Sequence, residues 1–296
     1  MIQPPPPDRP SADLRLRAEA LGQTLPPLLA EAEALAATVM LGEHGRRRAG
    51  MGDEFWQYRP SHAGDPARLI DWRRSARSDA TFVREREWQA AQSVSFWVDG
   101  SQSMGFAGAA DRPAKSDRAR LLALALAVLL LRGGERVGLC GPGVPPRGGR
   151  AQLLRLAEGL LDGTYDYGTP EETGIAAHGR AVFLSDFLGP LPAVEAAMTR
   201  AAERDAKGIL IQVLDPVEEA FPFDGRVLFE SMAGSIRHES LQAGALRQRY
   251  LDRLAERKDA LAALARRLGW QYLCHHTGQA AQPALLWAWM ALEGRR

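Results

Sequence analysis

The sequence predicts an α/β fold, in which a mostly parallel, Rossmann-like sheet is flanked by helices and preceded by a helical and irregular N-terminal segment. Two observations carry this prediction. From residue 93 onward, short apolar segments of strand length alternate with longer segments of helical periodicity. Three of the strand-like segments end at an aspartate, at Asp99, Asp186 and Asp215. Strands that are separated by helices form βαβ units, and the strands of such units run parallel.

The first 90 residues have a different character from the rest of the chain. Residues 1–12 are proline-rich and polar, which predicts an extended, disordered tail. Residues 13–40 have helical periodicity, and because Pro26 and Pro27 interrupt it we expect two helices that meet there. The glycines, arginines and aromatics that follow show no sustained periodicity. We take residues 13–90 as one N-terminal region.

The predicted α/β domain spans residues 91–296, and its elements follow in order. A first strand at 93–98 leads to a strongly apolar helix at 116–132, which Ser116 would cap. The remaining strands are expected at 136–140, 181–185, 208–214 and 270–274, and the remaining helices at 151–161, 192–206, 241–268 and 283–292. A further strand at 226–231 is expected to belong to a small hairpin inserted near residues 217–240.

Composition is that of an ordinary globular protein of 296 residues, with 46% hydrophobic and 25% charged residues. The net charge of +1 provides no general attraction to nucleic acid, so we expect no nucleic-acid partner. The N-terminus lacks the features of a signal peptide. The most apolar stretch, residues 121–131, is about half as long as a bilayer requires. We therefore expect a cytoplasmic protein with no membrane span.

The cysteines and paired histidines give no sign of a metal site. Cys140 and Cys274 are the only cysteines, which excludes a disulfide framework or a cysteine-rich zinc site. Both lie in apolar, strand-like runs and are expected to be reduced core residues. The adjacent residues His275 and His276 follow an apolar strand, where neighbouring side chains point to opposite faces. They are therefore a poor chelating pair.

Three oxygen-bearing side chains follow the first strand at every second position, at Asp99, Ser101 and Ser103. Open α/β sheets bind ligands outside the carboxyl ends of their strands, near a reversal of strand order. Such oxygen donors suit a hard cation, Mg²⁺ or Mn²⁺. Because few carboxylates would contact it directly, the ion would stay electrophilic and accept an acidic side chain from a partner. The structural alternative is a Ser- and Gly-rich turn in which Asp99 caps the loop.

A second aspartate is expected beside the first. Asp186 ends the strand at 181–185, and the crossover rule places that strand next to the first one, within reach of Asp99. The pattern Asp-x-Ser-x-Ser after a first strand resembles the metal-ion-dependent adhesion site of von Willebrand factor A domains. This resemblance implies that Ser101 and Ser103 ligate the cation and that Asp186 is the second aspartate of the site.

The resemblance also implies a threonine ligand from a later loop. Thr169 is the candidate, with Thr164 and Thr173 behind it. In the usual pattern a full helix separates this threonine from the next strand. Here only residues 170–180 are available and glycines interrupt them, which is a departure from the pattern.

Residues 50–77 carry a long motif: Gly-x-Glu-Phe, Tyr-x-Pro, Gly-Asp-x-x-Arg-x-Ile-Asp-Trp and Ser-Ala-Arg. The motif resembles the signature of the bacterial family called domain of unknown function 58, and the likeness extends over residues 42–290. The matching residues of the motif are Gly52, Glu54, Phe55, Tyr58, Arg59, Pro60, Gly64, Asp65, Arg68, Ile70, Asp71, Trp72, Ser75, Ala76 and Arg77.

The family resemblance implies a von Willebrand A-like domain with an unusual N-terminal preface. It also implies a MoxR-type AAA+ ATPase as partner, with which such proteins are thought to assemble, activate or insert metal into other complexes. Many relatives carry two transmembrane helices before the motif, and this chain resembles the shorter branch without them. The charged and aromatic residues of the motif allow two interpretations, a structural brace against the sheet or a partner-binding surface.

The leading hypothesis is a non-enzymatic, metal-dependent adaptor for a MoxR-type ATPase and an acidic client protein. One alternative is a metal-assisted phosphoester hydrolase that uses Asp99, Asp186 and Mg²⁺, which would need more carboxylates and a general base. The other alternative is a metal-free structural scaffold, which is favoured if Thr169 is not a ligand.

Overall fold

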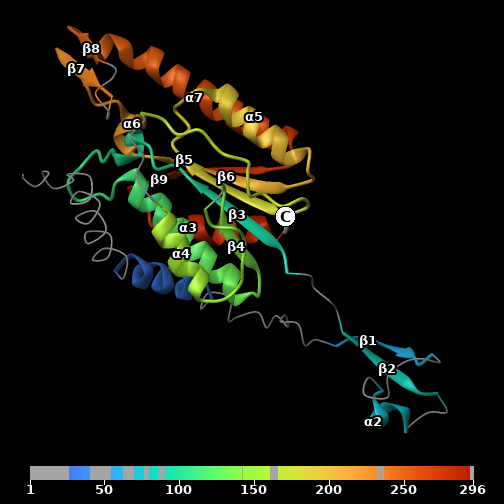
Figure 1. The fold of residues 1–296 in the computed structure, drawn as a ribbon. Coiled ribbons are helices and arrows are strands. Elements are labelled where there is room, and N and C mark those ends of the chain that lie inside the picture. Colours follow the sequence, from blue (N-terminus) through green and yellow to red (C-terminus); the bar gives the residue numbers. More distant parts are fainter. Residues whose placement is uncertain are drawn as a thin grey trace, which may run out of the picture. The chain divides into compact units, whose positions relative to one another are not determined.

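The computed structural model describes residues 27–40, 55–62, 70–76, 80–86, 91–141, 143–160, 166–231, 234 and 237–293, with backbone alone at 55–59, 74 and 83–86 (Figure 1). The chain forms two compact units. The larger unit comprises Met1–Leu41 and Gln92–Arg296, and the smaller comprises Gly42–Ala91. The predicted disordered tail and the first predicted helix lie outside the described residues.

A five-stranded parallel sheet forms the centre of the larger unit, which confirms the predicted α/β class. Its strands are β3 (Ser93–Val98), β4 (Arg136–Leu139), β5 (Arg180–Ser185), β6 (Lys207–Leu214) and β9 (Gln271–His276). The strand order is β4-β3-β5-β6-β9, and all four neighbouring pairs are parallel. The chain passes from β3 outward to β4 and then returns to β5 on the other side of β3. The strand order therefore reverses between β3 and β5, which is where such sheets bind ligands.

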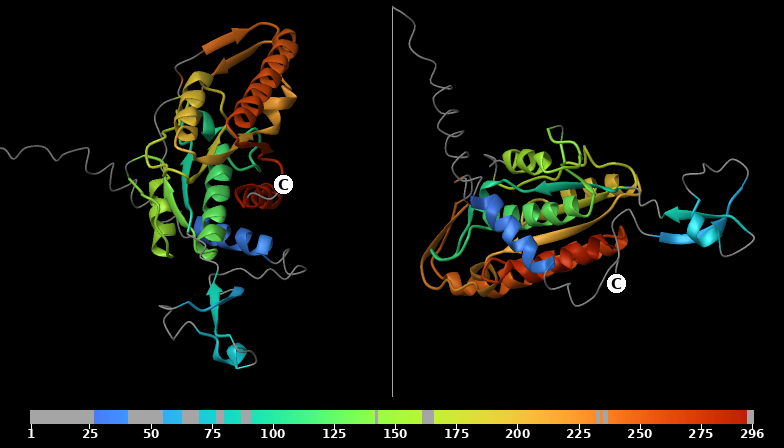
Figure 2. Two further views of the ribbon diagram at one scale, coloured as in Figure 1. Left: turned by 90° about the vertical axis from the view of Figure 1, so that its right-hand side faces the viewer. Right: turned by 90° about the horizontal axis from the view of Figure 1, so that it is seen from below.

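Helices cover both faces of the sheet, as Figures 1 and 2 show. One face carries α3 (Lys115–Arg132), α4 (Ala151–Gly159), α8 (Ala281–Leu292) and the helix at residues 27–40. The other face carries α5 (Leu191–Ala202) and α7 (Ala243–Arg267). The predicted helix after Pro26 is thus confirmed, and the predicted strands and helices from residue 93 onward all occur, with ends shifted by up to four residues.

Helix α3 is the central helix of the first face. Every residue from Leu121 to Leu130 is buried, because this run is leucine, alanine and valine on all sides. The prediction that Ser116 caps this helix is wrong. The helix begins one residue earlier, Ala114 holds the cap position, and no side chain caps it. Lys115 therefore lies in the first turn and is itself buried.

The chain after β6 forms a short helix and a hairpin. Helix α6 (Pro216–Ala220) follows β6 directly, and β7 (Val227–Glu230) pairs antiparallel with β8 (Arg237–Ser240). Four aromatic rings pack where α6, β7 and α7 meet, with ring centroids 4.9–5.8 Å apart: Phe221, Phe223, Phe229 and Tyr250. This cluster anchors the hairpin and fixes the carboxyl end of α6.

The smaller unit contains an antiparallel pair, β1 (Phe55–Pro60) and β2 (Phe82–Arg86), and a one-turn helix, α2 (Trp72–Ser75). Ser75 ties α2 to β2, because its hydroxyl donates to the Asp71 carbonyl at 2.8 Å and accepts from the Phe82 amide at 2.9 Å. Trp72 is 64% exposed. The motif residues Gly52, Glu54, Gly64, Asp65, Arg68 and Arg77 lie outside the described residues.

No helix in the described part of the chain combines the length and the apolar character that crossing a membrane demands.

Candidate functional site

The two predicted aspartates lie side by side where the strand order reverses. β3 and β5 pair in parallel register, with Val98 opposite Leu184. The Asp99 amide extends this pairing by donating to the Leu184 carbonyl at 2.9 Å. Asp99 and Asp186 thus follow neighbouring strand ends, as the crossover rule predicts.

Asp99 is buried, with 2% of its surface exposed, and both of its oxygens accept hydrogen bonds. Oδ1 accepts from the Ser101 amide at 2.8 Å, and Oδ2 accepts from the Ser185 hydroxyl at 2.6 Å. Burial raises the pKa of Asp99 above its ordinary value, although the bonds from Ser185 and Ser101 oppose this shift. Each carboxylate oxygen has a second lone pair, so Asp99 retains capacity for a further cationic or donor partner.

Ser101 and Ser103 lie together on the loop after β3. Ser101 is buried, Ser103 is half-buried, and their hydroxyl oxygens are 3.1 Å apart. Oxygens at neighbouring corners of a Mg²⁺ octahedron with bonds of about 2.1 Å lie about 3.0 Å apart. The two hydroxyls are hydrogen-bonded to each other, and their spacing is also compatible with two ligands of one Mg²⁺ ion.

The loop that holds Thr169 lies against the Asp99 loop, and its contacts come from Asp166 and Gly168. The Asp166 carbonyl accepts from the Ser103 amide at 3.0 Å. Gly168 approaches Asp99 so closely that a Cβ at this position would lie 2.1 Å from Asp99 Oδ1. The Thr169 side chain is exposed, and in the described part of the chain no hydrogen bond links it to Asp99 or Asp186. Of the other two threonine candidates, Thr173 is exposed and Thr164 lies outside the described residues.

Asp186 is held in a tight turn after β5. The Leu188 amide donates to its Oδ1 at 3.0 Å, and its carbonyl accepts from the Gln212 side-chain amide at 2.7 Å. Phe187, the next residue, has a positive φ of 50°. A non-glycine residue in this region stores strain of about 1–3 kcal/mol, which the surrounding bonds must offset. The turn fixes where the Asp186 carboxylate points.

A buried lysine pairs with Asp186. The Lys115 ammonium lies 2.9 Å from Asp186 Oδ2 and 2.7 Å from Glu218 Oε1, and only 1% of the Lys115 side chain is exposed. Burial alone would lower the pKa of Lys115, but the two carboxylates outweigh it and hold the pKa above its ordinary value. Lys115 is therefore charged at neutral pH and neutralises much of the negative charge of the site.

Glu218 reaches Lys115 because α6 begins with a capping box. The Asp215 side chain accepts from the Val217 amide at 2.9 Å, and Glu218 Oε2 accepts from the Asp215 amide at 2.8 Å. This reciprocal pairing fixes the first turn of α6 and leaves the other Glu218 oxygen facing Lys115. Burial raises the pKa of Glu218, and the Lys115 charge opposes this shift.

The possible metal ligands of this site differ in how well they could bind a divalent cation. Ser101, Ser103 and Asp99 are oxygen donors of the kind and spacing that fit Mg²⁺. Asp186 is less available, because the Lys115 ammonium on its Oδ2 would repel a divalent ion that used the same oxygen. The predicted ligands Asp99, Ser101 and Ser103 are thus brought together, and Asp186 lies beside them with a cationic partner of its own.

Lys115 and Glu218 are site residues that the sequence did not indicate. Lys115 precedes Asp186 by 71 residues and Glu218 by 103 residues in the sequence. A lysine in a first helical turn is ordinarily solvated, so only tertiary structure identifies it. The sequence does carry the capping-box pattern Asp-x-x-Glu at 215–218. This pattern predicts that Glu218 lies in the first turn of a helix, but it does not predict the contact with Lys115.

Comparison with known proteins identifies relatives over most of the chain. The family model described as "Protein of unknown function DUF58" matches residues 57–260, more than two thirds of the chain. Uncharacterized proteins from Mycobacterium bovis and Mycobacterium tuberculosis are 29% identical to this chain over 249 residues. These alignments cover 78% of this chain and 77% of each relative. The matched span includes β3, β5 and α6, and hence every residue of the site described above.

Proposed function

This chain belongs to the DUF58 family, and we propose that it is a non-enzymatic, metal-dependent protein-interaction module of the von Willebrand A type. It binds through the segment from Asp99 to Ser103, called the serine loop below, and the ion is Mg²⁺ or Mn²⁺. It acts in the cytoplasm as an adaptor for a MoxR-type AAA+ ATPase in the assembly or activation of other protein complexes.

One observation carries the proposal: two serine hydroxyls 3.1 Å apart stand beside a buried carboxylate at the reversal of strand order. Ser101, Ser103 and Asp99 would hold the ion, and the ion would supply an electrophilic centre for an oxygen from outside the chain. A carboxylate from a client protein suits that position, because it also balances the charge of the ion.

Metal binding is tested by calorimetry with Mg²⁺ and with Mn²⁺. We expect the wild-type chain to bind one ion and the double variant Ser101→Ala/Ser103→Ala to lose binding by at least tenfold. Ser240→Ala, which removes a hydroxyl from the hairpin strand β8, is the matched control and should bind as the wild type does. Wild-type binding that survives the double substitution would show that the ion does not use these serines, and a wild type that binds no ion would remove the metal from the proposal.

Partner binding is tested separately. Immobilised wild-type chain should retain a MoxR-type ATPase in Mg²⁺ and release it in EDTA, and the double serine variant should retain little in either buffer. If the variant retains as much ATPase as the wild type, the serine loop does not mediate the contact with the ATPase. If neither chain retains ATPase, the proposed partner is wrong, whatever the calorimetry shows.

A metal-free form of the same module is a second candidate, and Lys115 is the observation that favours it. Its ammonium already places a positive charge between Asp186 and Glu218. If Lys115 takes the place of the ion, the wild type binds no Mg²⁺ and Lys115→Met gains Mg²⁺ binding. If the serine loop holds the ion, the wild type binds Mg²⁺ and Lys115→Met only changes the affinity.

A further inference from the structure

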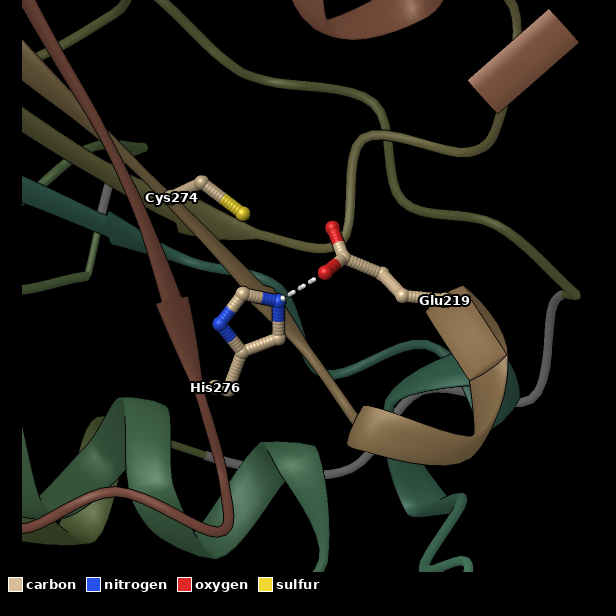
Figure 3. A group of neighbouring side chains, drawn as sticks. All are labelled: Glu219, Cys274 and His276. Atoms are coloured by element: carbon tan, nitrogen blue, oxygen red, sulfur yellow. Dashed lines mark ion pairs between the residues drawn. The ribbon is translucent and has the colours of Figure 1, made fainter. Parts of the chain in front are cut away.

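A second group of potential metal ligands also lies near the carboxyl ends of the strands, at β9, which is two strands away from β5. It consists of Glu219 from α6 and of Cys274 and His276 from β9, and their ligand atoms all lie within 4.8 Å of one another (Figure 3). Cys274 and His276 are two positions apart on one strand, so they point to the same face of the sheet. Figure 3 shows the imidazole, the carboxylate and the thiol converging on one space.

The neighbouring histidine takes no part in this group. His275 points to the other face, where its Nε2 lies 3.0 Å from the Arg118 guanidinium, and it is only 3% exposed. The prediction that the two histidines face opposite ways is thus confirmed. The pair that shares a face is Cys274 and His276.

The distances suit a tetrahedral ion after a small adjustment. His276 Nε2 and Glu219 Oε2 are 2.8 Å apart. Ligand atoms bound to one Zn²⁺ at about 2.0–2.3 Å lie about 3.3–3.8 Å from one another. The imidazole and the carboxylate would separate by less than about 1 Å to admit the ion. Three protein ligands would leave a fourth position open.

The ligand atoms are shielded, and their contacts are ion pairs rather than well-directed hydrogen bonds. Glu219 Oε1 and His276 Nε2 are buried atoms without a hydrogen bond in the described part of the chain. Glu219 instead pairs with the Lys258 ammonium of α7 and with His276.

Lys258 is the group that an incoming ion must displace. Its ammonium contacts Glu219, and its charge also acts on the Cys274 thiol. The Lys258 side chain is 27% exposed and comes from the surface of a long helix, so it can turn toward solvent without disturbing the core. An ammonium that balances Glu219 in the absence of a metal is a natural competitor of a cation at the same place.

We propose that Glu219, Cys274 and His276 form a second cation site, for a transition-metal ion of the Zn²⁺ class. One sulfur, one imidazole nitrogen and one carboxylate oxygen select Zn²⁺ or a similar ion over Mg²⁺, which takes oxygen ligands. The site shares no ligand with the loop at Ser101 and Ser103, and it does not depend on the function proposed for that loop.

The test uses Zn²⁺ in competition with a chromogenic chelator, and Co²⁺ as a spectroscopic probe of the thiolate. We expect the wild type to bind one Zn²⁺ and to give the ultraviolet charge-transfer band of a thiolate–Co²⁺ bond. Cys274→Ser and His276→Gln should each weaken Zn²⁺ binding at least tenfold, and Cys274→Ser should abolish the band. Cys140→Ser, which removes the other thiol, should leave both signals unchanged.

Lys258→Met separates a metal site from a purely structural cluster. If Lys258 competes with the ion, its removal tightens Zn²⁺ binding by at least threefold, whereas a structural cluster gains nothing. This variant also keeps the test decisive if Cys274→Ser fails to fold, which circular dichroism would reveal. A wild type that binds no Zn²⁺, a Co²⁺ band that survives in Cys274→Ser, or unchanged Zn²⁺ affinity in Lys258→Met would overturn the proposal.

Discussion

At the scale of single residues, Lys115 is a buried charge with two acidic partners. Its ammonium is buried between Asp186 and Glu218 and also lies 5.7 Å from the centroid of the Phe106 ring. Taking this charge out of water is costly, and the two carboxylates offset that cost only while all three charges remain in place. Replacing any one of the three residues by an uncharged one therefore leaves a charge unpaired and costs stability.

Lys115→Met should destabilise the chain strongly, because it leaves the buried Asp186 and the half-buried Glu218 carboxylates without their cation. Removing one partner of a buried ion pair costs about 3–5 kcal/mol. Urea unfolding followed by circular dichroism measures the change, and Lys207→Met at an exposed strand end is the matched control. Equal losses in the two variants would mean that the buried pairing contributes no net stability.

Gly168 is constrained by the closeness of Asp99. A methyl group at Gly168 would overlap Asp99 Oδ1, so Gly168→Ala must push the loop away from the carboxylate. We expect a loss of about 1–3 kcal/mol in the free energy of unfolding, and weaker Mg²⁺ binding if the serine loop holds the ion. Gly143→Ala, where the added methyl group meets nothing within 4 Å, should change neither quantity.

Cys140 should be a slow nucleophile. Burial, reinforced by the negative charge of Glu171, raises the pKa of its thiol to about 12. Since the thiolate is the reactive form, only roughly one molecule in 10⁴ is reactive at pH 8. Alkylation by iodoacetamide should therefore be slow in the folded chain and should keep accelerating as the pH rises above 9.

The rate at Cys140 is read by mass spectrometry of its peptide, and the chain in urea supplies the reference rate of a free thiol. Alkylation of the folded chain at the urea rate would contradict the raised pKa. Cys274 gives an internal comparison in the same digest. Zn²⁺ should protect Cys274 and leave the rate at Cys140 unchanged.

At the scale of elements, α6 contributes one glutamate to the surroundings of each candidate site. Asp215 at its N-cap is buried and accepts from Val217, from the Thr277 hydroxyl at 2.8 Å and from Arg112 at 3.2 Å. Asp215 thus joins the end of β6 to the segment after β9. The Asp215 side chain therefore helps to orient the five-residue helix α6.

Asp215→Ala should lose the cap and leave Thr277 and Arg112 without an acceptor. A lost N-cap costs about 1 kcal/mol and an unsatisfied buried group about 1–3 kcal/mol, so the total should be about 2–4 kcal/mol. Asp224→Ala, at an exposed turn, serves as the control in urea unfolding. A cost no greater than that of Asp224→Ala would show that α6 is held from elsewhere.

Much at this scale was predictable, and the exceptions have physical causes. The strand ending at Asp99 and the one ending at Asp186 are apolar runs of clear length, and parallel crossovers leave few ways to order them. Helix α6 was not predicted as an element, because five residues are too few to establish a helical period. The resemblance predicts Thr169 as a ligand. The structure brings its loop to Asp99 through Gly168, and the role of the Thr169 hydroxyl stays a prediction.

At the scale of the whole larger unit, two apolar cores lie on opposite faces of one sheet. The helix at residues 27–40 belongs to the first core, where it buries Ala32, Ala36 and Val39. This helix precedes the sheet by more than 50 residues, and the smaller unit lies between them in the sequence. The helix at residues 27–40 is therefore part of the α/β unit.

A chain that lacks residues 1–41 should be less stable than one that lacks residues 1–26, because only the first loses the helix. Exposure of the apolar residues beneath it should cost about 3 kcal/mol or more. Thermal unfolding compares the two, and binding of a hydrophobic dye reports the uncovered surface. Identical melting temperatures and dye binding would mean that the first core is complete without this helix.

Helix α6 carries two consecutive glutamates toward different cationic groups. Glu218 faces Lys115 beside the serine loop, and Glu219 faces Lys258 and His276. Because both side chains depend on one five-residue helix, a displacement of α6 by an ion at one place alters the pairing at the other. The free energies of occupying the two places are then linked, and whatever factor Zn²⁺ imposes on Mg²⁺ affinity, Mg²⁺ must impose on Zn²⁺ affinity.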